Sequence, residues 1–267
     1  AASSVLYLSI GGTDMAKKVK LSNSVLIHRQ VSRFDKKTEV GVFLQQTSKN
    51  SKTGNMVQLL IIRLGVHPSE AVKNGMDKAI CNTCKHMLQP DGSRSCYCNV
   101  LFIAGSIWNA YKRGNIDKVN LNTASELCRG RVVRLGSYGD PACINPRVWT
   151  ELLAHSTRHT GYTHNWQHER NSLKRTVMAS VDSPAEYWTA LDKGWRTFRV
   201  RRPDQKLLPY EIVCPASIEA GKKTTCLECS LCNGKSGKDD NRKNIAIMAH
   251  GPGTSAFITL SSLLSAN

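Results

Sequence analysis

The chain has few acidic and few aromatic residues. Its 267 residues include 20 aspartates and glutamates against 37 lysines and arginines, which gives a formal net charge of +17. Aromatic residues make up 6% of the chain, which disfavours an extended platform for stacking nucleic-acid bases. The scarcity of carboxylates also disfavours a nuclease site with two magnesium ions, which needs paired acidic residues. The charge itself favours a polyanion partner, chiefly DNA or RNA, with a generally basic protein as the plainer interpretation.

Long apolar runs are also missing. None approaches the roughly 20 residues that a membrane-spanning helix needs, so we expect no membrane partner. Seven of the ten cysteines occur in C-x2-C and C-x-C units, and no signal peptide precedes them. This arrangement favours a cytoplasmic metalloprotein over a secreted disulfide protein. Residues 1–14 are interpreted as a tag or leader, because Met15 is a plausible native start.

The densest cysteine group lies near the C-terminus. Cys226, Cys229 and Cys232 form a C-x2-C-x2-C run, and Cys214, which precedes a proline, lies upstream. This pattern is typical of the ligands of a 4Fe–4S cluster. A four-cysteine zinc site is the competing interpretation, since zinc also binds paired C-x2-C units, and four reduced structural thiols are the third. The spacing favours the iron–sulfur cluster over Zn²⁺.

A second group lies in the first half of the chain. Cys81 and Cys84 form a C-x2-C unit, and Cys96 and Cys98 form a C-x-C unit after an eleven-residue insert. We predict a second metal centre here, in which one of the C-x-C cysteines can be a spectator and His86 a substitute ligand. Two further cysteines lack partners at ligand spacing and are expected to be ordinary buried residues: Cys128 and Cys143.

Hydrophobic periodicity predicts an α/β fold. A basic β-hairpin is expected from residues 19–31 and 39–46. Strands are expected at residues 57–64, 131–135, 160–164, 176–182, 195–200, 211–214 and 244–249. Helices are expected to begin at residue 68 and to cover residues 107–113, 146–155 and 185–193. This alternation predicts a parallel sheet in a partial or complete β/α (TIM-like) barrel, with an open doubly wound sheet as alternative.

The expected organisation has four parts. Residues 1–14 are the tag or leader, and residues 15–56 the basic hairpin region. Residues 57–252 form the barrel-like metal-binding domain, and residues 253–267 a C-terminal tail.

Polar side chains follow the apolar part of several predicted strands. They are Tyr138 and Asp140, Tyr162, His164 and Trp166, Ser180 and Asp182, Arg199 and Arg201, and Cys214. Because the loops at the carboxyl ends of β/α strands converge, we expect these residues to share one pocket with the C-terminal cysteines. Asp140, His164 and Asp182 are the candidate catalytic proton carriers. The two aspartates can instead be helix caps.

Six basic residues are candidates for nucleic-acid binding: Lys36, Lys37, Lys49, Lys52, Arg199 and Arg201. The lysines form a cationic polar stretch that is either a phosphate-facing rim or a solvated loop. The two arginines can hold a phosphate bidentately or form a solvated basic strand end. Residues 50–54 lack the leading glycine of a Walker sequence, so we do not expect nucleoside triphosphate binding there.

Several segments, in order, resemble the phage and mobile-element "gene product 88" family. They include Gly136-Ser137-Tyr138-Gly139-Asp140-Pro141, Gly161-Tyr162-Thr163-His164-x-Trp166, residues 194–200, and both cysteine groups. The resemblance covers about residues 45–252 and implies a phage, plasmid or other mobile element in a bacterial host cell, without implying a reaction. The group is distantly similar to radical S-adenosylmethionine enzymes, which hold a 4Fe–4S cluster at the mouth of a partial β/α barrel. This chain lacks their usual C-x3-C-x2-C triplet after the first strand.

Three functions follow as hypotheses. The first is a metalloprotein that binds nucleic acid in replication, transcription or genome handling. The second is a metalloenzyme, either radical and dependent on S-adenosylmethionine or redox-active, with its active site at the mouth of the barrel. The third is a structural protein held together by its metals. The sequence leaves open whether the protein is an enzyme.

Overall fold

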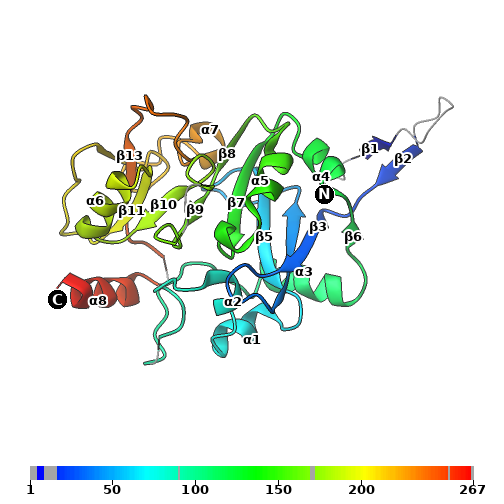
Figure 1. The fold of residues 1–267 in the computed structure, drawn as a ribbon, viewed down its shortest axis with the longest axis horizontal. Coiled ribbons are helices and arrows are strands. Elements are labelled where there is room, and N and C mark those ends of the chain that lie inside the picture. Colours follow the sequence, from blue (N-terminus) through cyan, green and yellow to red (C-terminus); the bar gives the residue numbers. More distant parts are fainter. Residues whose placement is uncertain (1–4, 9–16, 90, 169–171, 252, 266–267) are drawn as a thin grey trace.

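The computed structural model describes residues 5–8, 17–89, 91–168, 172–251 and 253–265. Two sheets lie side by side (Figure 1). The six-stranded sheet has the order β6 (Asp117–Lys118), β3 (Ser24–Val31), β4 (Glu39–Gln45), β5 (Val57–Arg63), β7 (Val132–Tyr138) and β8 (Arg158–Thr160). The five-stranded sheet has the order β12 (Glu211–Val213), β13 (Asn244–Met248), β11 (Thr197–Arg201), β10 (Met178–Val181) and β9 (Tyr162–Thr163).

The strand pairs confirm a parallel α/β core. Each pair from β5 to β8, and each pair in the five-stranded sheet, is parallel. The predicted hairpin is present as β3 and β4, and β4 also pairs with β5, so the hairpin is continuous with the core sheet. Among the described strands, none pairs across from one sheet to the other. The described strands therefore do not close into a complete barrel.

Gly161 connects the two sheets. It is the single residue between β8 and β9. Its N–H donates to the carbonyl of Cys232, and its own carbonyl accepts from the N–H of Met178. A Cβ atom at this position would lie 2.8 Å from Cγ1 of Val177, closer than packed carbon atoms approach. The absence of a side chain lets the chain pass from one sheet to the other within one residue.

Eight helices accompany the described strands. They are α1 (Pro68–Lys73), α2 (Lys78–Cys81), α3 (Ile103–Lys112), α4 (Leu121–Leu127), α5 (Pro146–Leu153), α6 (Pro184–Asp192), α7 (Cys226–Cys229) and α8 (Thr254–Ser265). Asn145 and Ser183 cap α5 and α6, each followed by a proline whose missing N–H costs nothing in a first turn. Among the described helices, none is long and apolar enough to cross a membrane.

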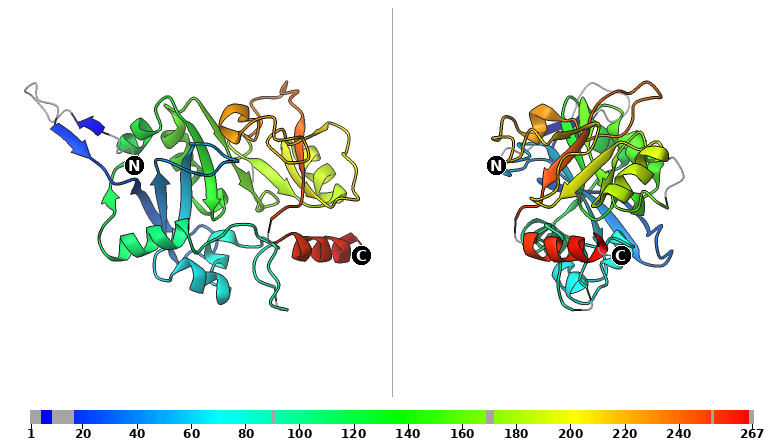
Figure 2. Two further views of the ribbon diagram at one scale, coloured as in Figure 1. Left: turned by 180° about the vertical axis from the view of Figure 1, so that it is seen from behind. Right: turned by 90° about the vertical axis from the view of Figure 1, so that its left-hand side faces the viewer.

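The segment that was predicted as a C-terminal tail contains a helix that the sequence did not predict. Residues 254–265 form α8, which lies below the five-stranded sheet (Figure 2). The predicted leader lies mostly outside the described residues, although Val5–Leu8 forms β1, antiparallel to β2 (Lys17–Lys20).

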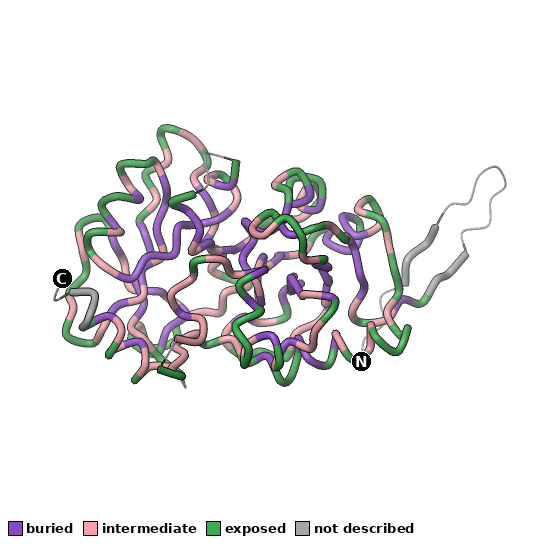
Figure 3. The backbone as a smooth tube through the Cα atoms, turned by 60° about the horizontal axis from the view of Figure 1, so that its bottom comes forward, coloured by how far each residue is buried: buried purple, intermediate pink, exposed green. Residues whose placement is uncertain are grey.

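Buried backbone runs through the central strands of both sheets (Figure 3). In β5, six consecutive residues from Val57 to Ile62 are buried, as expected for a strand covered on both faces.

Candidate metal centre

Eight of the ten cysteines line one cavity of about 410 Å³. They are Cys81, Cys84, Cys96, Cys98, Cys214, Cys226, Cys229 and Cys232. The two cysteines predicted to be ordinary buried residues, Cys128 and Cys143, are fully buried and are not among its lining residues. The structure thus brings both predicted metal groups to a single interior space. We call Cys214, Cys226, Cys229 and Cys232 the C-terminal group, and the other four the loop group.

Backbone contacts position the C-terminal group. Cys214 directly follows β12, and its N–H donates to the carbonyl of Ala246 in β13. Cys226 and Cys229 are the first and last residues of α7, where Thr225 and Glu228 form a reciprocal capping box. The N–H of Cys226 also donates to the carbonyl of Lys52, which ties α7 to the segment that enters β5.

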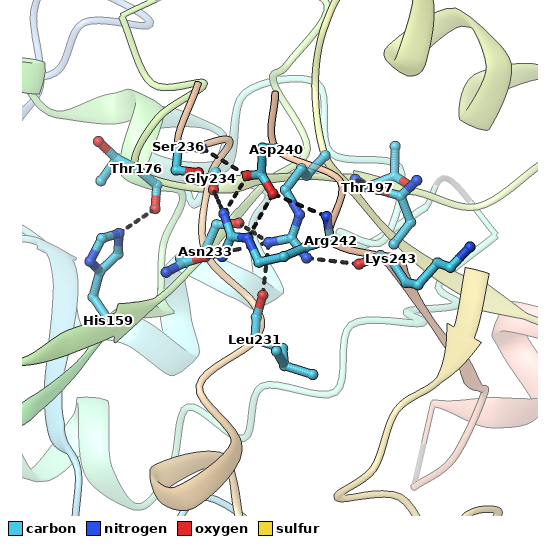
Figure 4. A network of polar contacts seen from close by, with 12 residues as sticks. His159, Thr176, Thr197, Leu231, Asn233, Gly234, Ser236, Asp240, Arg242 and Lys243 are labelled. Atoms are coloured by element: carbon cyan, nitrogen blue, oxygen red, sulfur yellow. Dashed lines mark hydrogen bonds and ion pairs between the residues drawn. The ribbon is translucent and has the colours of Figure 1, made fainter. Parts of the chain in front are cut away.

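Two arginines fasten the segment that carries Cys232. Arg196 is buried and donates to the carbonyls of Leu231, Asn233 and Lys243. Arg242 donates to the carbonyl of Gly234 and forms an ion pair with Asp240 (Figure 4). These bonds hold both sides of Cys232, so its sulfur has a fixed place on the cavity wall.

The loop group lies on less regular backbone. Cys81 ends α2, and the other three follow in the loop before α3. The thiol of Cys98 lies 3.3 Å from the carbonyl oxygen of Ser137, to which it donates. Interaction with the neighbouring Cys98, assisted by the charge of Arg94, outweighs burial and lowers the pKa of Cys96 to about 5. A lowered pKa favours the thiolate, which is the form that binds metals.

Cys214 and Cys232 are buried, Cys226 and Cys229 are half-buried, and the four thiols influence one another electrostatically. Burial, and then the nearby thiols of Cys214, Cys226 and Cys229, raise the pKa of Cys232 to about 12. Burial and the neighbouring thiols Cys226 and Cys229 also raise the pKa of Cys214. A bound cation would offset both the burial and the mutual repulsion, so the donor set fits a metal centre.

Six of the ten polar strand-end residues reach the cavity as predicted. They are Tyr138, Asp140, Tyr162, His164, Ser180 and Cys214. The prediction was wrong for Arg199 and Arg201, because successive side chains of a strand point to opposite faces. In β11 it is Phe198 and Val200 that face the cavity. Trp166 lies in the core, where its indole N–H donates to the carbonyl of Ser180.

Arg199 and Arg201 are also corrected as nucleic-acid contacts. Arg199 is fully buried and makes two hydrogen bonds to Glu211, of 2.8 and 2.7 Å. Arg201 is 5% exposed and pairs with Glu219. Both guanidinium groups are buried and paired with carboxylates, which leaves them inaccessible to a phosphate backbone.

The predicted lysines divide into two kinds. Lys36, Lys37 and Lys49 are exposed. Lys52 instead lines the cavity, where its Nζ lies 2.8 Å from Nε2 of His250. Burial lowers the pKa of Lys52, while the thiols of Cys214 and Cys226 oppose that effect. Lys52 therefore faces the C-terminal group rather than an external partner.

Asp140 has the capping role that was the alternative to catalysis. Its carboxylate accepts hydrogen bonds from the hydroxyl of Thr163 and the N–H groups of Ala142 and His164, at 2.7 to 2.9 Å. The amide of Asn165 adds a fourth bond, at 2.9 Å. Both carboxylate oxygens of Asp140 therefore have hydrogen-bond partners, and Asp140 acts as a positioning residue for the backbone at His164.

His164 has a strong electrostatic bias toward its charged form. Burial opposes its protonation, but Cys84, Asp182 and Asp140 outweigh burial and raise the pKa of His164 to about 10. Asp182 lies beside it and is paired with His86, whose Nε2 is 2.8 Å from Oδ2 of Asp182. No local pattern in the sequence predicts this pair, because its members lie 96 positions apart.

Three other side chains of the cavity wall were not predicted as site residues: Arg134, Tyr97 and Phe257. Arg134 lies on β7, and its guanidinium donates to the hydroxyl of Tyr97 at 2.9 Å. The alternation of β7 was the signal that could have placed Arg134, Gly136 and Tyr138 on one face.

Comparisons of the chain with protein-family models, with curated proteins and with solved structures found no match.

Proposed function

We propose that this protein is a metalloenzyme whose cysteine-lined cavity binds an iron–sulfur cluster and encloses a small-molecule substrate. The observation that carries the proposal is the convergence of eight cysteines on one interior space of about 410 Å³. That volume lies in the range of about 300–1,000 Å³ of small-molecule sites. A purely structural metal would not need a cavity of this size, and separate structural sites would not need to share one.

The separation of the thiols favours a cluster over mononuclear zinc. Four thiolates on one zinc at about 2.3 Å place their sulfurs roughly 3.8 Å apart. Among the described residues, one group of three or more metal-binding side chains has all its ligand atoms within 4.8 Å, and it contains no cysteine. Thiolates on a 4Fe–4S cluster lie farther apart because each binds a different iron.

The C-terminal group would hold the cluster, and its neighbours would serve the substrate. A cluster bound there would supply electron transfer or an iron site for the substrate. Arg134 and Lys52 place positive charge on the cavity wall, which suits an anionic substrate group. His164 also lines the cavity, beside Cys84, and would hold a proton there. The apolar side chains of Phe198 and Val200 would exclude water from their part of the cavity wall.

The same cavity supports a finer description of the fold. With Gly161 as the bend, the parallel strands β5 to β12 would form a partial β/α barrel whose interior is the cavity. This is the arrangement that the resemblance to radical S-adenosylmethionine enzymes implies, and the gene product 88 resemblance would add a mobile-element setting. S-adenosylmethionine is then a candidate co-substrate.

Anaerobic purification with analysis of iron, sulfide and zinc tests the proposal. We expect about four irons and four sulfides per chain. Replacing Cys226 and Cys229 by alanine should remove them, while Cys128→Ala, which changes a buried cysteine outside the cavity, should not. Zinc without iron or sulfide in the wild-type protein would overturn the redox proposal.

A second candidate, nucleic-acid binding, is favoured by the charge of +17 and by the exposure of Lys36, Lys37 and Lys49. Binding of a fluorescent oligonucleotide, as DNA and as RNA, should weaken steeply with salt. Replacing the three lysines by glutamine should lower the salt slope, whereas Lys52→Gln should not. A salt slope that the triple variant leaves unchanged would place any binding elsewhere.

A further inference from the structure

A second kind of metal-binding group lies beside the loop group of cysteines. His86 comes from the loop after α2, His164 follows β9, and Asp182 follows β10. One ligand atom of each lies within 4.8 Å of the other two. His86 lies 78 positions from His164 and 96 from Asp182, and it meets them where two neighbouring parallel strands end. None of the three is a cysteine, although His86 is also the substitute ligand predicted for the loop group.

Hydrogen bonds and ion pairs fix the ring of His86 and the carboxylate of Asp182. Nε2 of His86 lies 2.8 Å from Oδ2 of Asp182, and Nδ1 lies 2.7 Å from the hydroxyl of Ser95. Lys85 also contacts Oδ2 of Asp182, at 3.3 Å, and is shared with Glu186 at 2.9 Å. The side chain of Asp182 is 3% exposed, so its position is set by these neighbours and not by solvent.

One buried oxygen in this group has no partner. Oδ1 of Asp182 is inaccessible and accepts no hydrogen bond from any residue that the structure describes. An unpaired buried carboxylate oxygen is costly, and such an atom calls for a ligand, an ion or a bound water. Phe257 of α8 stacks on the ring of His86, with 5.8 Å between ring centroids, and thereby limits access from that side.

Two imidazoles and one carboxylate form a donor set that suits first-row divalent metals. This set leaves coordination positions open, as in non-haem iron sites and in catalytic zinc sites. The hydroxyl of Ser95 would act as the outer partner that fixes the His86 ring. His86 and His164 line the cavity, so the open positions would face the proposed substrate.

We propose that His86, His164 and Asp182 form a mononuclear site for a divalent first-row metal, Fe²⁺ or Zn²⁺, that opens into the cavity. The site goes beyond the proposed cluster and does not require it. Its ligands are nitrogen and oxygen, so its spectroscopic signature differs from that of a thiolate centre.

Cobalt loading of the chain, as purified under anaerobic conditions, tests the site. Bound metals are counted per chain after loading, and the wild-type spectrum is compared with those of His164→Gln and Asp182→Asn. We expect each variant to hold about one divalent ion fewer. The wild-type minus variant difference should show cobalt ligand-field bands without thiolate-to-cobalt charge transfer. Ser95→Ala should weaken the affinity about 10–100-fold.

The matched control is His159→Gln, which changes a partly buried histidine of β8 that contacts the carbonyl of Thr176 outside the group. It should bind cobalt as the wild type does. A variant without Cys226 and Cys229 separates the two proposals, because it should lose the cluster and keep the nitrogen–oxygen signal. Equal cobalt binding by wild type, His164→Gln and Asp182→Asn, with all three folded by circular dichroism, would overturn the site and leave a hydrogen-bonded Ser95–His86–Asp182 relay.

Discussion

The two cysteine groups line the same cavity but are held in different ways. Backbone hydrogen bonds to other segments fix the C-terminal group: Cys214 bonds to β13, Cys226 to the carbonyl of Lys52, and Cys232 to Gly161, with Arg196 and Arg242 as further support. The backbone bonds of Cys84 and Cys96 stay within the loop group's own segment, which is tied to the sheet chiefly by the contacts of His86 and Lys85 with Asp182. A centre held by backbone keeps its geometry without its metal, whereas one held by a few side chains depends on their charge state. We therefore expect the C-terminal group to be the better organised of the two.

The largest expected effect comes from the ion pair beneath the C-terminal group. Arg199 and Glu211 join β11 to the start of β12, which leads to Cys214, and both side chains are at most 1% exposed. Arg199→Met leaves the Glu211 carboxylate buried without its partner and should destabilise the fold by about 3–5 kcal/mol. Urea unfolding measures this loss. The control Arg29→Met breaks an exposed pair with Glu39 and should cost at most about 1 kcal/mol. Equal losses of unfolding free energy in the two variants would mean that burial does not decide how much the Arg199–Glu211 pair stabilises the fold.

A clash next to Cys232 should have the next largest effect. A Cβ atom at Gly234 would lie 2.3 Å from backbone atoms of Lys174 and Arg175. Gly234→Ala should therefore cost about 3 kcal/mol and reduce the metal content of the C-terminal group. In the loop group, Gly92 has open space and a φ of +80°, so Gly92→Ala should cost only about 1 kcal/mol, from backbone strain. Thermal unfolding and metal analysis of both variants make the comparison direct.

Acid should loosen the same segment through Asp240. The hydrogen bond from Arg242 lowers the pKa of Asp240 below its ordinary 3.8. A depressed carboxyl pKa stabilises the fold above the unfolded value, and this contribution is lost as the pH falls through the folded value. Asp240→Asn should therefore cost about 2 kcal/mol near neutral pH and progressively less as the pH falls below the ordinary carboxyl value of 3.8. Urea unfolding across this range checks the slope, and a constant difference between the proteins would refute the assignment.

The smallest expected effect concerns the cap of α7. Thr225→Ala removes half of the capping box and should cost about 1 kcal/mol. Metal release from the C-terminal group to a chelator should become faster, while release from the loop group should not change. Asn145→Ala, which removes a cap from α5 away from the cavity, is the matched control. Faster release in that control as well would point to general destabilisation.

Much of the fold could be read from local patterns. The predicted strands at residues 57–64, 176–182 and 244–249 correspond to β5, β10 and β13, because continuous apolar runs bounded by polar residues mark buried strands. Helices α5 and α6 were found through their Pro starts. Helix α8 was missed, although residues 254–265 contain no charged residue, proline or glycine.

The site could be predicted only in part, for a geometric reason. The spacing of Cys226, Cys229 and Cys232 is local, and one helical turn followed by a short segment places them together. Arg199 and Arg201 were assigned to the wrong face. The sequence shows where a strand ends, but it does not show which of its alternating side chains face the cavity. His86 and Asp182 were each predicted to have a site role, but no local signal paired them, because 96 positions separate them.

The sequence by itself determined most of the strands, several helices, the parallel pairing and the two cysteine motifs, because propensity, periodicity and ligand spacing act over a few residues. Only the tertiary structure decided that both motifs share one cavity, that Arg199 and Arg201 turn away from it, and that His86 meets His164 and Asp182. These outcomes depend on strand order, on the bend at Gly161 and on which face each strand presents. Such choices are made by packing between segments far apart in the chain, where no short sequence pattern can record them.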